Sequence, residues 1–353
     1  MTIILPVYNQ ERYLEAALSD ALGQTYEDIE VIAVNDGSTD SSGLILREIS
    51  SADNRLKVIE KSNGGLVSAN STGIRAASGE YICFLDPDDR VEPDFVSSFV
   101  KELDRPYDFI AKGFQTESAG RSTPFSLKED RVFTAGELRA LSNHYLMTPS
   151  LAMGDSIYVT RWNKMYRRAV LLRFVDEYAA CGKISLCEDV VFAYLLLQHA
   201  ESGKSCSGSG SYHYFVHDVS MCHYFDYDRS ASELDVTFDR FQTIINRYTR
   251  DLTPALLAYY VGLAGQLEMA IGKGGSSARF IYSELQNNKR FRESVACAAE
   301  YSRSALSVGV IKTHLLYRKV PFWLYRFARN AYKLFKRWVK SSGVAGLLHG
   351  RVG

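Results

Sequence analysis

The chain has 353 residues, 46% hydrophobic and 23% charged, a composition typical of a folded globular protein, which excludes a chain that is disordered throughout. Its formal net charge is zero, but residues 301–353 contain eleven basic and no acidic residues, so the first 300 residues, with 30 basic and 41 acidic residues, carry a net charge of −11. This length favours two domains or one large domain with an appendage, and the segregated charge indicates a C-terminal tail with its own partner.

The first 100 residues alternate strand-like and helix-like patterns. Such alternation predicts a parallel sheet with right-handed crossovers, and each strand-to-helix loop then lies at one edge of the sheet, where such folds bind ligands. A helix with Pro93 near its first turn follows the fourth strand. The predicted strands are residues 2–5, 29–34, 56–60 and 80–85, and the predicted helices between them are residues 11–22, 40–50 and 66–77.

The loops at this edge combine polar side chains, small residues and carboxylates. Asp36 can accept hydrogen bonds from a base or a ribose hydroxyl, while Gly64 and Gly65 allow the chain to approach a ligand closely. Taken singly, Thr39 or Asp40 can be a helix cap, and the two glycines can form a turn. The loops are Pro6-Val7-Tyr8-Asn9, residues 35–40, Asn63-Gly64-Gly65 and Asp86-Pro87-Asp88-Asp89.

The fourth loop places three carboxylates within four residues at the end of a buried strand. Uncompensated carboxylates repel one another, so the arrangement favours a divalent cation among them, and carboxylate oxygens suit Mg²⁺ or Mn²⁺. The competing interpretation is a turn followed by a helix N-terminus, where Asp is favoured anyway. Asp89 is expected to be a cap on the next helix.

Together these motifs resemble the family-two inverting glycosyltransferases of the GT-A fold, over roughly residues 2–225. The resemblance implies a Rossmann-like, mostly parallel α/β sheet flanked by helices, with a helical C-terminal extension at residues 226–353. It also implies that Asp36 contacts the uracil of a UDP-sugar, that Pro6 and Val7 line the base pocket with Tyr8 and Asn9 beside them, and that Asp86 and Asp88 hold ribose and metal. A bound Mn²⁺ or Mg²⁺ stabilises the charge that develops on the departing diphosphate.

Transfer to a hydroxyl also needs a base near the anomeric carbon. Glu188 and Asp189 open an apolar helix pattern, where the helix dipole favours anions, and the resemblance assigns the base to Asp189. Helix capping is the competing explanation for this acidic pair. Two further segments resemble the family. In Arg161 to Tyr166, Trp162 and Asn163 would shape the sugar pocket and Lys164 would meet a phosphate, or Trp162 is simply packed; in Tyr212 to Ser220, His217 can approach the metal.

The chain also departs from the family pattern. Asn70-Ser71 stands where the family commonly has Arg-Asn, which removes a cation near the base or phosphate, although Asn70 remains a candidate for the donor site. Phe215 replaces a frequent arginine. The segment 202–211 is rich in Gly and Ser where a strand is usual, and it is expected to be a flexible lid or a weak edge strand.

The most informative part beyond residue 226 is a predicted basic amphipathic helix at residues 321–340. At 100° per residue, Leu324, Phe327 and further apolar residues fall on one face, whereas Arg326 and five other basic residues fall on the opposite face. Such helices lie in the interface of anionic membranes. Docking on the protein's own core or on nucleic acid is the alternative, and we expect no nucleic-acid partner.

Other features constrain the location. The six cysteines have no CxxC spacing, which favours reduced thiols over a zinc or disulfide framework. The N-terminus has no secretory signal pattern, and the best apolar run, residues 255–271, is interrupted by Gln266 and Glu268. We therefore expect a cytoplasmic protein bound peripherally to the inner face of the membrane.

The resemblance, taken together with the predicted membrane location, implies a metal-dependent hexosyl- or N-acetylhexosaminyl-transferase. It would move a sugar from a UDP-sugar to a glycan or lipid-linked acceptor in surface polysaccharide synthesis. A catalytically silent relative acting as a membrane scaffold is the alternative. A nicotinamide-dependent dehydrogenase is disfavoured, because no GxGxxG follows the first strand.

Overall fold

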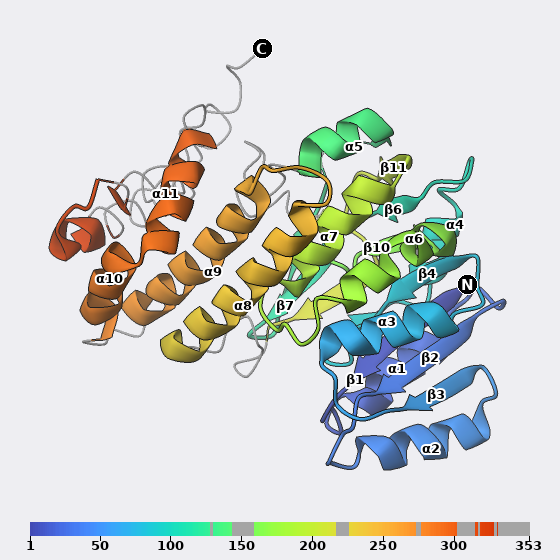
Figure 1. The fold of residues 1–353 in the computed structure, drawn as a ribbon. Coiled ribbons are helices and arrows are strands. Elements are labelled where there is room, and N and C mark those ends of the chain that lie inside the picture. The colour runs from blue at the N-terminus through green and yellow to red at the C-terminus, as the bar shows by residue number, and fades with distance from the viewer. Residues whose placement is uncertain are drawn as a thin grey trace, which may run out of the picture.

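The computed structural model describes residues 1–127, 130–142, 159–216, 226–272, 277–301, 315–316, 318–327 and 330. Its N-terminal part alternates strands and helices as predicted, with boundaries that move by no more than a few residues (Figure 1). The elements are β1 (Thr2–Val7), α1 (Leu14–Leu22), β2 (Glu30–Asn35), α2 (Ser42–Ala52), β3 (Leu56–Glu60), α3 (Leu66–Ala76) and β4 (Tyr81–Phe84).

The middle of the chain completes the sheet region. Its elements are β5 (Arg90–Val91), α4 (Phe95–Val100), β6 (Phe109–Ala111), β7 (Phe114–Ser118), β8 (Arg121–Phe125), β9 (Arg131–Thr134), α5 (Ala135–Ser142), β10 (Lys164–Arg167), α6 (Arg168–Ala179), α7 (Glu188–His199), β11 (Ser202–Ser205) and β12 (Tyr212–Phe215).

An eight-stranded sheet in the order β3-β2-β1-β4-β10-β6-β11-β9 forms the centre of this region. Strands β3, β2, β1 and β4 are parallel, whereas β10 runs antiparallel to both of its neighbours. Strand β1 is buried along its whole length, as expected for a parallel strand covered by helices on both faces. The carboxyl ends of β1, β2 and β4 therefore meet at one edge, which confirms the α/β prediction for this part.

The segment 202–211 differs from its prediction. Residues Ser202–Ser205 form strand β11, which lies inside the sheet between β6 and β9 and is neither a lid nor an edge strand. Close packing explains the glycine in this strand, because a Cβ at Gly203 would clash with the ring of Phe109 in β6. A second, four-stranded sheet has the order β5-β12-β7-β8.

Helices follow the sheet region from residue 226 onward. They are α8 (Tyr227–Ile245), α9 (Thr253–Gly272), α10 (Ser277–Asn287) and α11 (Lys289–Tyr301), and Figure 1 shows them as a group beyond α7, on the side of the molecule away from α2 and β3. The two regions share a hydrophobic core; the rings of Tyr194 in α7 and Phe241 in α8, for example, meet edge to face at 5.2 Å.

Among the described residues, α9 is the one helix with the length and apolarity to cross a membrane, but 56% of its most apolar window is buried inside the protein. That burial is typical of a core helix. Of the predicted amphipathic helix at residues 321–340, only residues 321–327 and 330 are described, and residues 322–327 are helical. His217 and the rest of that helix lie outside the described residues.

Candidate active site

Asp36 organises the loop edge next to β2. Its side chain is 3% exposed, forms an ion pair with Lys61, and accepts hydrogen bonds from the backbone N–H groups of Gly64 (3.0 Å) and Gly65 (2.7 Å). Gly65 adopts φ +84°, which a residue with a Cβ rarely tolerates. The Asn63-Gly64-Gly65 turn is thus held in place by the carboxylate that was predicted to contact a base.

The first loop is joined to the second at the same edge. Pro6 and Val7 end strand β1 in the core, whereas the following Tyr8 is 48% exposed. Asn9 has φ +53°; its N–H donates to Ser38 Oγ (3.0 Å), and its Oδ1 accepts from the Thr39 N–H (2.8 Å). The structure therefore brings the predicted base-binding loops together through Asn9.

Asp89 is not the helix cap that the sequence suggested. It is 2% exposed and accepts hydrogen bonds from the Tyr212 hydroxyl (2.7 Å) and the Phe215 N–H (2.8 Å), both in β12. Burial, together with the charges of Asp86 and Asp88, raises its pKa well above the usual range. Asp89 therefore anchors the carboxylate turn to the second sheet, and local sequence could not reveal partners more than 120 residues away.

Arg161 lies between the two acidic segments of the site. Its side chain is 2% exposed; one terminal nitrogen donates to Glu188 Oε1 (2.6 Å) and the other to Asp86 Oδ1 (3.1 Å). Arg161 was not predicted as a site residue, because the resemblance assigned roles to Trp162, Asn163 and Lys164 of the same segment. The antiparallel pairing of β10 with β4 brings this arginine to the carboxylate turn.

Asp189 and Glu188 begin helix α7, as predicted. The preceding residue, Cys187, has φ +62°, a left-handed conformation that is uncommon for a non-glycine residue and often marks a functional site. Burial first, and the charge of Glu188 second, raise the pKa of Asp189 to about 7, although Arg161 opposes the shift. A carboxylate with a pKa near neutrality is suited to act as a general base.

Three predicted neighbours of the donor lie in the interior. Asn70 is fully buried in α3, so its side chain does not line the rim. Lys164 is also fully buried; its Nζ donates to Asn163 Oδ1 (2.9 Å), and burial lowers its pKa well below the usual value. Trp162 is 8% exposed and stacks on the rings of Tyr212 (4.4 Å) and Tyr214 (5.4 Å), so it is a packed residue.

The carboxylate turn has the chemistry of a Mg²⁺ or Mn²⁺ site that relies on its substrate for further ligands. Burial, with Asp88 and Glu188 contributing, raises the pKa of Asp86 to about 6, although Arg161 lowers it. Within the described residues, no three His, Cys, Asp or Glu side chains converge on one point. One or two carboxylates completed by substrate phosphates are the usual magnesium set, so Asp86 and Asp88 fit such an ion.

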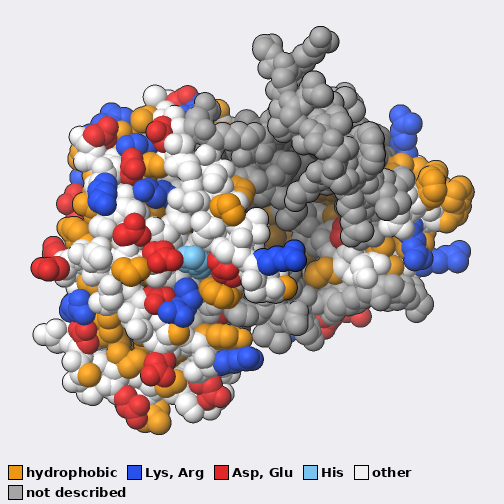
Figure 2. All heavy atoms as spheres, turned by 180° about the vertical axis from the view of Figure 1, so that it is seen from behind, with side chains coloured by type: hydrophobic (Ala, Val, Ile, Leu, Met, Phe, Trp, Pro, Cys, Tyr) orange, Lys and Arg blue, Asp and Glu red, His pale blue; other side chains and the backbone are white. Residues whose placement is uncertain are grey.

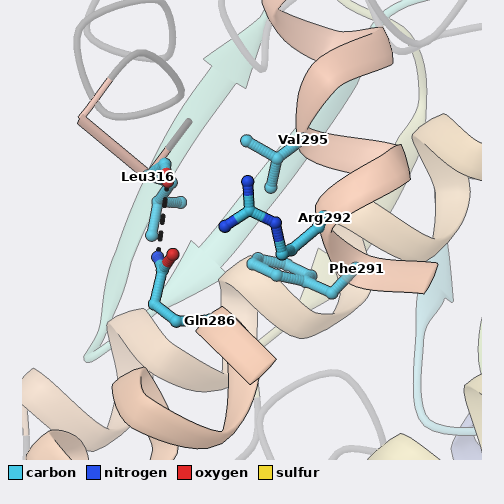
Figure 3. A pocket seen from close by; sticks show the side chains of 5 residues that line it. All are labelled: Gln286, Phe291, Arg292, Val295 and Leu316. Atoms are coloured by element: carbon cyan, nitrogen blue, oxygen red, sulfur yellow. Dashed lines mark hydrogen bonds between the residues drawn. The ribbon is translucent and has the colours of Figure 1, made fainter. Parts of the chain in front are cut away.

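A separate small hollow lies in the helical region (Figure 3). Gln286 of α10 and Arg292 of α11 line it, and the Gln286 amide donates to the carbonyl of Leu316 (3.4 Å). Phe291 and Val295 complete its lining. Because none of these residues belongs to the sheet edge, this hollow is distinct from the candidate active site.

Comparisons with known proteins bear on the family and the fold of the chain. A model of the glycosyl transferase family 2 matches residues 2–174. The chain is 36% identical over 210 residues to the uncharacterized glycosyltransferase EpsJ of Bacillus subtilis, a match that spans 58% of each chain. It is 28% identical over 312 residues to the putative glycosyltransferase EpsH of the same organism, covering 87% of this chain and 86% of EpsH.

The fold is similar to that of residues 1–349 of S. aureus TarS, solved in complex with UDP-GlcNAc. The TM-score is 0.62, at 18% sequence identity, and the match covers 94% of this chain and 91% of the TarS chain. The likeness extends over the sheet region and the helices that follow it.

Proposed function

Because the chain belongs to glycosyl transferase family 2 and has the predicted GT-A fold, we propose that it moves a sugar from a UDP-sugar to a hydroxyl group, with inversion at the anomeric carbon. One observation carries this proposal: Arg161 joins the donor-side Asp86 to Glu188, directly beside Asp189, a carboxylate with a pKa of about 7. In this arrangement a donor-binding carboxylate and a base share one site.

The residues divide into a donor side and a base side. On the donor side, Pro6 to Asn9, Asp36 and the Asn63-Gly64 turn receive the nucleotide, and Asp86 and Asp88 hold Mn²⁺ or Mg²⁺. Such an ion, when bound, would neutralise charge on the diphosphate. On the base side, Asp189 accepts the proton of the acceptor hydroxyl, and Glu188 is held by Arg161 and by the Tyr178 hydroxyl (2.7 Å).

We further propose a hexose or N-acetylhexosamine as the transferred sugar. The support is the fold similarity to TarS, whose structure contains UDP-GlcNAc. A growing surface polysaccharide or a lipid-linked glycan would be the acceptor, because the C-terminal surface described next suits a membrane.

That surface combines exposed aromatic and basic side chains. Trp323 is 69% and Phe327 67% exposed, while Tyr325 is buried against Tyr282 at a ring distance of 5.4 Å. The segment therefore docks through Tyr325 and Phe322, whose rings both lie on Tyr282, and leaves Trp323 and Phe327 exposed. Figure 2 shows hydrophobic and basic side chains next to one another at this end of the molecule, and Arg326 is among the exposed basic residues. We propose that this surface binds the anionic inner face of the cell membrane.

A thermal-shift panel of UDP-, GDP- and dTDP-sugars with Mn²⁺ or Mg²⁺ tests the donor. A ligand present at 100 times its Kd stabilises the native state by about 2.7 kcal/mol, and we expect the largest rise in Tm with a UDP-sugar and metal together. Asp88→Ala should lose the metal-dependent part of that rise. A rise that is larger with GDP- or dTDP-sugars would contradict the proposal, and binding without any UDP release would favour the scaffold alternative.

A further inference from the structure

We propose that Arg161 is a positioning residue that fixes the donor-side carboxylate Asp86 and the base-side carboxylate Glu188 in one rigid unit. This inference rests on the proposed function and adds a residue to it. A single planar guanidinium can donate from two nitrogens at a fixed spacing, whereas a lysine ammonium is a point charge. Arg161 uses both terminal nitrogens in this way, one for each carboxylate.

The burial of the three side chains makes this bridge stiff. The exposed fractions are 2% for Arg161, 7% for Glu188 and 26% for Asp86. Water therefore competes weakly with the pair formed by Arg161 and Glu188, and the more open Asp86 keeps access to a ligand. Glu188 therefore fixes the buried end of the bridge, and Asp86 at the other end remains accessible to the donor.

Neighbouring elements hold both ends of the bridge. The guanidinium carbon of Arg161 lies 5.3 Å from the ring centre of Phe84, the last residue of β4, and the carbonyl of Arg161 accepts from the Tyr166 hydroxyl (2.7 Å). On the other side, Glu188 Oε2 accepts from the Tyr178 hydroxyl of α6 (2.7 Å). Residues from β4, β10, α6 and α7 thus meet at one arginine, as expected for a preorganised site.

The location of the cation differs from the one that the resemblance implied. Position 70, where a cation was expected from the resemblance, holds the fully buried Asn70. Its side chain lies next to the Tyr178 hydroxyl, which in turn bonds Glu188. A cation at position 70 would therefore approach Glu188 from α3. In this chain Arg161, in the segment before β10, supplies the positive charge to Glu188 and reaches Asp86 as well.

Three variants of the full-length chain test the bridge. Arg161→Met removes the charge at similar length and should lower kcat at least 100-fold, with a smaller change, about tenfold, in the Kd for UDP with Mn²⁺ measured by calorimetry. Arg161→Lys should recover only part of kcat, because it cannot donate to both carboxylates in the same geometry. Arg75→Met is the control, since it removes an exposed ion pair with Asp176 outside the site. Wild-type kcat in Arg161→Lys would overturn the two-armed bridge.

A double variant separates positioning from simple charge neutralisation. Arg161→Met leaves Glu188 buried without its counter-ion and can fail to fold, whereas Arg161→Met combined with Glu188→Gln removes both charges. We expect the double variant to regain the wild-type Tm while its kcat stays at least tenfold below that of Glu188→Gln alone. Equal kcat in these two variants would show that Arg161 only neutralises Glu188, and the inference would be wrong.

Hydrogen exchange provides a readout that does not depend on turnover. In the double variant, exchange should rise together in residues 86–90 and 187–191, because one bridge holds both segments. A rise in only one segment, or in neither, would contradict the inference even if the enzyme is inactive. Failure of the proposed function is a different result, since wild-type protein would then release no UDP from any UDP-sugar.

Discussion

Replacing Asp189 with Asn should abolish transfer and stabilise the protein at the same time. Asn has nearly the same shape and can still accept the hydrogen bond from the Val190 N–H (2.9 Å), but it cannot take a proton from an acceptor hydroxyl. General-base catalysis contributes about 10²–10⁴-fold to rate, so we expect kcat to fall by that factor. Donor binding should be retained, because Asp189 belongs to the base side of the site.

The effect on stability follows from the raised pKa of Asp189. Its folded value of about 7 lies above the ordinary 3.8, so between these pH values the native state binds more protons than the unfolded state, and stability falls as pH rises. Three pKa units correspond to up to about 4 kcal/mol. Asp189→Asn should therefore be more stable than wild type by up to this amount at pH 8, and equal to it near pH 4.

Urea unfolding at pH 4 and pH 8, together with UDP release from pH 5 to 9, measures both effects. Wild-type kcat should rise about tenfold per pH unit up to about pH 7, since only ionised Asp189 accepts the proton. Asp228→Asn is a matched control, because Asp228 is also in the first turn of a helix, α8, but is exposed. Full turnover by Asp189→Asn, or a loss of stability at pH 8, would refute the reasoning.

Three further changes test other parts of the site. Asp36→Asn should weaken UDP binding at least tenfold in calorimetry, because an amide cannot pair with Lys61 and accept both glycine N–H groups; unchanged affinity would contradict this role. Tyr212→Phe removes the hydroxyl that donates to Asp89, and urea unfolding should show a loss of about 1–3 kcal/mol, whereas no loss would mean that the turn is held elsewhere. Trp323→Ala with Phe327→Ala should reduce co-sedimentation with anionic vesicles, and undiminished binding would exclude this surface as the anchor.

Sequence patterns predicted the helices and strands whose formation depends on residues close to one another along the chain. Strand β3 at Leu56–Glu60 and the start of α7 at Glu188 have the predicted boundaries. The spacing of apolar residues, and the Gly, Asn and Asp residues that mark turns between elements, are local signals that can be read along the chain. The loops of the candidate site followed from these elements, since carboxyl ends of parallel strands share one edge.

Contacts between distant residues were not predictable in this way. Asp89 has the local signature of a helix cap, yet its partner Tyr212 is 123 residues away. Arg161 and Asp86 are 75 residues apart and meet only because β10 inserts antiparallel beside β4. A buried arginine next to a Trp gives no periodic signal in the sequence. A Gly/Ser-rich run such as residues 202–205 becomes a strand only because strands β6 and β9 pair with it on either side.

The charge distribution of the site implies that metal and donor bind together. In the described part, Asp86, Glu188 and Asp189 all interact with the charge of Arg161, and a diphosphate alone would add further negative charge to this group. Because the pKa of Asp86 is about 6, a cation must displace a proton from this carboxyl group below that pH. UDP affinity measured with Mn²⁺ should therefore fall as pH drops from 7.5 to 5.5, and should be weak with EDTA at both values. Equal affinity with and without metal would mean that the protein's own cations balance the diphosphate.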